Sequence, residues 1–62
     1  MVQRVVDHPA LILADHADPE LEHALAPIPE REGRVLRVVY NRGVDPIRVM
    51  TAFFDRTMRG KL

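Results

Sequence analysis

The stretch Gly33–Phe54, GRVLRVVYNRGVDPIRVMTAFF, decides the fold of this chain. Its segments 35–40 and 47–54 are rich in β-branched, aliphatic and aromatic residues, which suit a pleated, half-buried surface. The segment 41–46 between them contains a glycine and a proline, and both favour turns. The stretch therefore predicts one β-hairpin with a connection of about six residues.

The hairpin predicts its own two faces if Tyr40 lies opposite Ile47. One face would then be mostly apolar, with Leu36, Val38, Tyr40, Ile47, Val49, Thr51 and Phe53. The other face would carry two arginines among apolar residues: Val35, Arg37, Val39, Arg48, Met50, Ala52 and Phe54. We expect the first face to cover the core and the second to look partly to solvent or to a ligand. A shift of one residue would exchange the faces, so the pairing is a hypothesis.

The N-terminal part predicts a short strand followed by a first helix. Residues 1–6 contain three valines and could form the strand. Asp7 or His8 could then cap a helix that has Pro9 at its first position, where the missing N–H costs nothing. The apolar run 10–14 would form this helix.

A second helix start is indicated by Asp18 and Pro19. Glu20 in the first turn would favour the helix dipole, and apolar residues recur at helical spacing after it. Two prolines, Pro27 and Pro29, would end the helix. The whole pattern predicts an α+β fold, in which two short N-terminal helices pack on a small antiparallel sheet centred on the C-terminal hairpin.

Length and composition limit the classes of protein to consider. Sixty-two residues form a single domain, 1–62, and so short a chain buries only about 60% of its unfolded surface. We therefore expect a homo-oligomer. The absence of cysteine excludes disulfides and thiolate metal sites. No apolar run approaches the roughly 20 residues of a membrane span, and no signal-peptide pattern is present, so we expect a cytoplasmic protein without membrane contact.

The net charge of zero conceals an uneven distribution along the chain. Residues 1–31 contain two basic and six acidic residues, whereas residues 32–62 contain seven basic residues, six of them arginine, and three acidic ones. The two halves could simply neutralise each other in the fold. Alternatively, the arginines form an anion-binding face, because the planar guanidinium suits phosphate.

The candidate chemical groups allow a structural and a functional interpretation. His8 could shape a turn or act as a general acid or base, while His16 and His23 show no metal-ligand spacing and His23 reads as a surface residue. The hydroxyl groups of Tyr40 and Thr51 could serve packing or point into a shallow cleft. The arginines, among them Arg34, Arg37, Arg48, Arg56 and Arg59, make RNA phosphate the plainest target. No metal or other cofactor is expected, and metal-independent RNA cleavage fits the available groups.

Three segments carry a resemblance to a known family: the run Pro19–Leu25 leading to Pro27, the run Leu36–Tyr40, and the run Val49–Arg56. They resemble small bacterial and phage domains of the barnase–EndoU–colicin–RelE type, in an uncharacterised, toxin-like subgroup. The resemblance implies a compact α+β ribonuclease, often the toxin of a toxin–antitoxin pair with a cognate antitoxin as partner.

Carried onto this chain, the resemblance implies a site that consists of His8, Arg37, Tyr40, Thr51 and Arg56. Arg37 and Arg56 would hold phosphate, and His8 or Tyr40 would transfer protons. The leading hypothesis is therefore a RelE-like ribonuclease or a toxin derived from one, acting on RNA. The alternative is a non-catalytic interaction module that forms a homodimer or binds a partner protein through the sheet edge.

Overall fold

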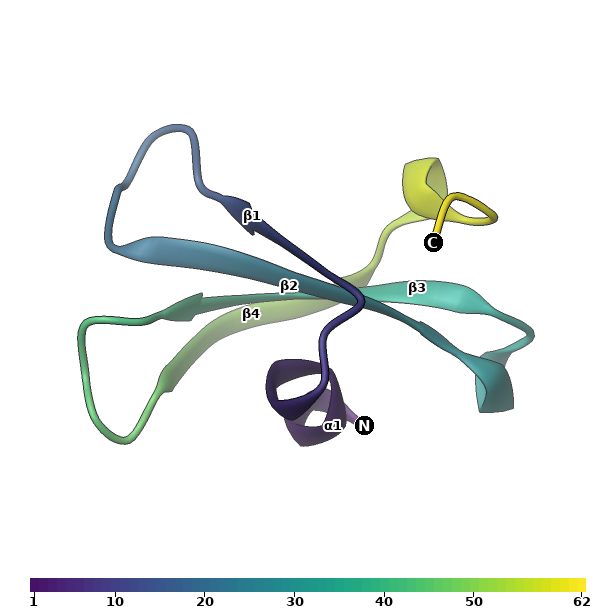
Figure 1. The fold of residues 1–62 in the computed structure, drawn as a ribbon, viewed down its shortest axis with the longest axis horizontal. Coiled ribbons are helices and arrows are strands. Elements are labelled where there is room, and N and C mark those ends of the chain that lie inside the picture. The colour runs from purple at the N-terminus through teal and green to yellow at the C-terminus, as the bar shows by residue number, and fades with distance from the viewer.

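The chain forms one four-stranded antiparallel sheet with a short helix on one face (Figure 1). The computed structural model describes all 62 residues. The elements are α1 (Val2–Asp7), β1 (Leu11–Ala14), β2 (Leu21–Ile28), η1 (Pro29–Arg31), β3 (Arg34–Asn41), β4 (Arg48–Phe54) and η2 (Arg56–Met58). The strands lie in the order β1-β2-β3-β4, so each pairs with its neighbour in the chain. None of the helices has the length and apolar character needed to cross a bilayer.

The α+β class and the hairpin of β3 and β4 are confirmed, but the assignments of the N-terminal half are wrong. In the segment 1–6, predicted as a strand, Met1 is the N-cap of α1 and the other five residues lie in this helix, whereas both predicted helices are the strands β1 and β2. The sheet therefore has four strands and is covered by one helix.

The helix signal predicted at Asp18 is a turn signal, and Asp15 forms a turn just before it. Asp15 Oδ2 accepts hydrogen bonds from the backbone N–H groups of Ala17 at 3.0 Å and Asp18 at 2.9 Å. Asp18 Oδ1 accepts one from the N–H of Glu20 at 2.9 Å. An aspartate that caps a helix uses the same acceptor atom, so the sequence alone cannot separate the two outcomes. Here the bonds close the hairpin between β1 and β2.

Pro27 is compatible with a strand because of where β1 begins. Leu25 directs its carbonyl oxygen toward the β1 side, where the N–H of Ala10 binds it at 2.8 Å. Pro27, two residues later, faces the same side, but the pairing with β1 extends no further than Leu25. The missing N–H of the proline therefore leaves no ladder bond unmade.

The predicted register of the C-terminal hairpin is also wrong. Tyr40 pairs with Val49 and not with Ile47, and Val39 pairs with Thr51. An irregularity between Val39 and Tyr40 leaves Met50 without a partner on β3. This extra residue shifts the register by an odd number, so Thr51 lies on the face opposite Tyr40.

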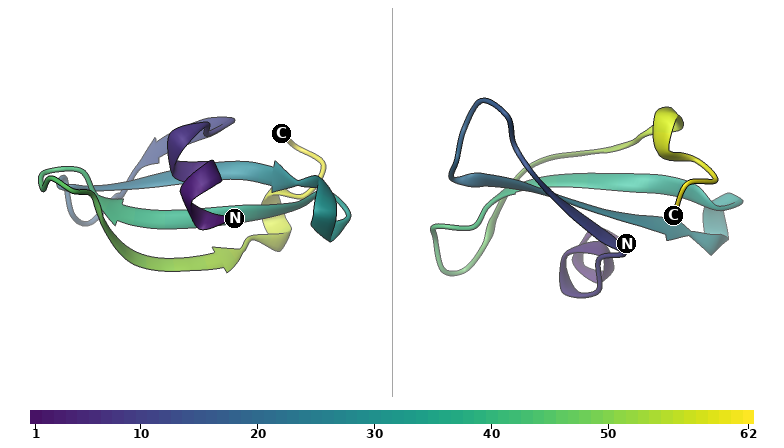
Figure 2. Two further views of the ribbon diagram at one scale, coloured as in Figure 1. Left: turned by 90° about the horizontal axis from the view of Figure 1, so that it is seen from below. Right: turned by 45° about the horizontal axis from the view of Figure 1, so that its top comes forward.

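Each face of the sheet is covered by a different terminal segment of the protein. On the α1 face lies the main core, which consists of Val5, Ala24, Ala26, Ile28, Leu36, Val38 and Tyr40. On the other face, here called the η2 face, lie η2 and the C-terminus (Figure 2). The side chains of Leu25 and Val35 are fully buried on this second face.

Candidate functional site

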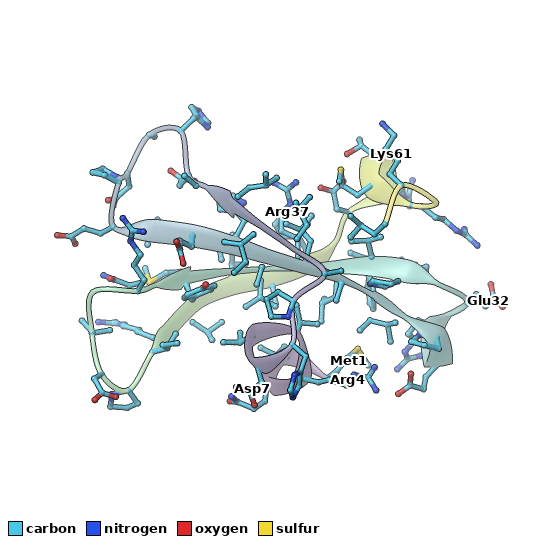
Figure 3. The ribbon with its side chains drawn as sticks, viewed as in Figure 1. Met1, Arg4, Asp7, Glu32, Arg37 and Lys61 are labelled. Atoms are coloured by element: carbon cyan, nitrogen blue, oxygen red, sulfur yellow. The ribbon has the colours of Figure 1, made fainter.

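Four side chains, joined by two hydrogen bonds and one ion pair and here called the polar network, cross the η2 face. Asp15 Oδ1 lies 2.8 Å from His23 Nε2, and His23 Nδ1 lies 3.1 Å from a terminal guanidinium nitrogen of Arg37. The other terminal nitrogen of Arg37 lies 3.0 Å from Asp55 Oδ2. The side chains are between 12% and 19% exposed. The four residues therefore link the β1–β2 turn to the start of η2 across the two central strands, and Figure 3 shows Arg37 on the side of the sheet away from α1.

The hydrogen-bond donors in this network determine which ring nitrogen of His23 carries the proton. A guanidinium can only donate, so His23 Nδ1 must accept the bond from Arg37. His23 Nε2 then carries the proton and donates a hydrogen bond to Asp15. This hydrogen bond, with those from Asp18 and Ala17, lowers the pKa of Asp15 to about 2. Because both ring nitrogens are engaged, His23 has no free nitrogen for a substrate.

At the other end of this network of side chains, Asp55 joins the sheet to η2. Besides Arg37, its carboxylate binds Thr57, which donates from its backbone N–H at 3.0 Å and from its hydroxyl at 2.6 Å. The bond from Thr57 is the main cause that lowers the pKa of Asp55. Asp55 is thus the N-cap residue of the short η2 helix.

Three arginines line a hollow beside this junction, here called the arginine hollow. It has a volume of about 420 Å³ and is lined by Glu32, Arg34, Val35, Phe54, Asp55, Arg56 and Arg59. The guanidinium of Arg34 lies over the ring of Phe54, 4.4 Å from its centre. None of the three arginines in the arginine hollow takes part in an ion pair. The four ion pairs of the protein involve Arg4, His23, Arg37 and Arg42.

The five site residues suggested by the resemblance lie in two groups. Arg37 and Thr51 are on the η2 face, and Arg56 lines the arginine hollow next to it. Tyr40 belongs to the core of the α1 face, where its hydroxyl donates to Glu22 Oε1 at 2.8 Å, and burial raises its pKa. His8 ends α1. The structure thus links Arg37 to Arg56 through Asp55, and it places His8 and Tyr40 apart from them.

Sequence reasoning missed Asp15, His23 and Asp55. His23 and Arg37 share a face only if β2 is a strand, and the sequence pattern indicated a helix there. The segment 21–26, LEHALA, shows no alternation of polar and apolar residues that would have indicated a strand. The side chains form no group of three or more histidines and carboxylates that could hold a metal ion.

Comparison of the chain with protein-family models, with curated proteins and with solved structures finds no match.

Proposed function

We propose that this chain is an RNA-binding domain of the RelE-like, ribonuclease-derived type, which binds RNA phosphate at the arginine hollow without a metal ion. The observation that carries the proposal is the convergence of Arg34, Arg56 and Arg59 on one hollow while none of them is paired with a carboxylate. The resemblance of the sequence to ribonuclease domains supports RNA as the polyanion.

The charges around the hollow favour an anion. Of its two carboxylates, Asp55 is neutralised by Arg37, and only Glu32 opposes the three arginines. A guanidinium binds a phosphate group through two parallel N–H bonds, which suits this arrangement.

Recognition at the hollow would concern the phosphate and not the base. The one aromatic ring in the hollow, Phe54, is covered by Arg34 and offers no free surface for base stacking. We therefore expect binding with little sequence preference and a strong dependence on salt.

The experiment is a titration of a labelled single-stranded RNA of mixed sequence, followed by fluorescence anisotropy at several salt concentrations in excess EDTA. Arg56→Ala and Arg59→Ala should each weaken binding and reduce the slope of log affinity against log salt by roughly one. Arg48→Ala is the matched control, because this exposed arginine lies at the opposite end of β4. Equal effects of all three variants, or no binding by the folded wild type, would contradict the proposal.

The same samples test cleavage. Fragments of the labelled RNA that appear in EDTA with the wild type and not with Arg37→Ala would extend the proposal to metal-independent ribonuclease activity. Binding without fragments would identify a domain that retains RNA affinity alone.

A second candidate function, homodimerisation, is favoured by the edge strand β4. Val49, Met50 and Phe53 are 45%, 54% and 47% exposed. No charged residue lies between Arg48 and Asp55, although edge strands usually carry charges that prevent pairing. We propose that β4 pairs with β4 of a second copy.

Sedimentation of the native protein tests this pairing. Phe53→Lys should convert a dimer to a monomer, whereas Ile12→Lys, on the other edge strand and 49% exposed, should leave the mass unchanged. A wild type that sediments as a monomer at high protein concentration would rule the dimer out.

A further inference from the structure

We infer that Asp55 is a positioning residue of the arginine hollow: although it is an acid at an anion site, its negative charge strengthens anion binding. The inference rests on the proposed function. It assigns Arg37 an indirect role, in which the guanidinium acts through Asp55 and does not touch the phosphate.

The two carboxylate oxygens of Asp55 have different partners. Oδ2 forms an ion pair at 3.0 Å with the guanidinium of Arg37, which belongs to the central strand β3. Oδ1 accepts from the backbone and the hydroxyl of Thr57, which belongs to η2. The side chain is only 12% exposed. It therefore ties η2 to the sheet at a fixed distance.

Arg37 is also positioned by residues on the side away from Asp55. Its guanidinium donates to His23, and His23 donates to Asp15, so the position of Arg37 does not depend on Asp55 alone. The Nε–H of Arg37 is buried without a hydrogen-bond partner. With both terminal nitrogens engaged and 19% of the side chain exposed, Arg37 has little left to offer a phosphate.

The short helix that Asp55 caps holds two of the three arginines of the hollow, Arg56 at its start and Arg59 at its C-cap. Arg56 follows Asp55 directly, and the N–H of Arg59 donates to the carbonyl oxygen of Arg56 at 3.3 Å. Both arginines line the hollow. If η2 loses its cap, the backbone that holds both arginines at the hollow becomes less ordered, and a phosphate would have to order it at an entropic cost.

Glu32 provides the matched comparison. It lines the same hollow, but its carboxylate makes no hydrogen bond or ion pair. Neutralising Glu32 should remove a simple repulsion, whereas neutralising Asp55 should release η2. The two substitutions change the net charge equally and are expected to change RNA affinity in opposite directions.

The test uses the labelled single-stranded RNA and the anisotropy assay described above. Asp55→Asn keeps an oxygen for Thr57 but presents an NH₂ group to Arg37, so we expect about fivefold weaker binding at fixed salt. Glu32→Gln should bind about twofold more tightly, because one repulsive charge is lost. Tighter binding by both variants would overturn the inference.

A second variant tests the other half of the link without changing any charge. Thr57→Val removes the hydroxyl that donates to Asp55 and should also weaken RNA binding. In NMR spectra, Asp55→Asn should shift the backbone amides of residues 56–59 in the absence of RNA, and Glu32→Gln should not. Unshifted amides in the folded Asp55→Asn variant would contradict the positioning role.

The outcome also separates this inference from the proposed function. If Arg56→Ala weakens binding while Asp55→Asn and Glu32→Gln both strengthen it, the RNA site stands and the inference fails. If neither Arg56→Ala nor Arg59→Ala has an effect, the proposed function fails first.

Discussion

The two faces of the same sheet are closed by different chemistry. On the α1 face, Val5 and six residues of β2 and β3 form a core whose one polar group, the hydroxyl of Tyr40, is bonded to Glu22. The η2 face is crossed instead by a network of polar side chains that runs from Asp15 through His23 and Arg37 to Asp55. The core of the first face depends on apolar packing, which is insensitive to pH. The second depends on groups that titrate, and this difference can be tested face by face.

The largest loss of stability is expected on the α1 face. Ile28 is fully buried there, and Ile28→Ala should lower the free energy of unfolding by about 2–5 kcal/mol, because burial is lost and a cavity remains. Urea denaturation measures the effect. The control is Ile12→Ala, since Ile12 is 49% exposed and should change the unfolding free energy far less. Equal losses would mean that the α1 face is not the main core.

A smaller loss of stability is expected when the network of polar side chains on the η2 face is interrupted. Arg37→Met keeps most of the apolar stem but leaves Asp55 Oδ2 and His23 Nδ1 without a partner, which should cost about 1–3 kcal/mol. In a double-mutant cycle by urea denaturation, Asp55→Asn should add less to Arg37→Met than it costs alone, because the two residues share one bond. Strict additivity would show that the contact contributes nothing to stability.

Acid should act mainly on the η2 face. The pKa of Asp15 is about 2 in the folded chain against a usual 3.8, and the pKa of Asp55 is also lowered. A lowered carboxyl pKa gives stability that is present above pH 4 and is lost as the pH falls toward 2. Thermal unfolding between pH 5 and pH 2 should therefore show a steep fall. Asp15→Asn should flatten it, and an unchanged slope would contradict the bond to His23.

The smallest effect is expected at the polar group of the α1 face. Tyr40→Phe removes one hydrogen bond to Glu22, with a cost of about 0.5–1.5 kcal/mol in urea denaturation. The phenol of Tyr40, the one tyrosine in the chain, should titrate above pH 10 when followed by absorbance, because burial and Glu22 raise its pKa. A phenol that titrates at the usual pH would place Tyr40 in solvent.

The sequence predicted the hairpin of β3 and β4, though not its register, because its runs of β-branched and aromatic residues agree with its turn residues. It could not predict β1, since the short apolar run 10–14 fits a strand or a helix equally well, and it could not predict β2, whose apolar residues recur at helical spacing. The aspartates at positions 15 and 18 act as acceptors in turns and in helix caps alike.

The candidate site was predictable to a similar degree. Arg37 and Arg56 were selected among the arginines by the resemblance, and the structure links them through Asp55. The contact between Asp15 and His23 spans a hairpin, and that of His23 with Arg37 depends on the register between β2 and β3. A single extra residue at Met50 was enough to move Thr51 to the other face.

The uncrossed strand order also sets how the chain can fold. Six of the seven core residues lie on β2 and β3, which are joined by the short turn at η1. Closing this hairpin orders a short loop and brings most of the core together before β1, β4 or α1 is in place. Contacts between neighbours in the chain favour fast folding, so we expect the β2–β3 hairpin to be largely formed in the transition state. Substitutions at Val38 should then slow folding, whereas those at Val5 should mainly speed unfolding.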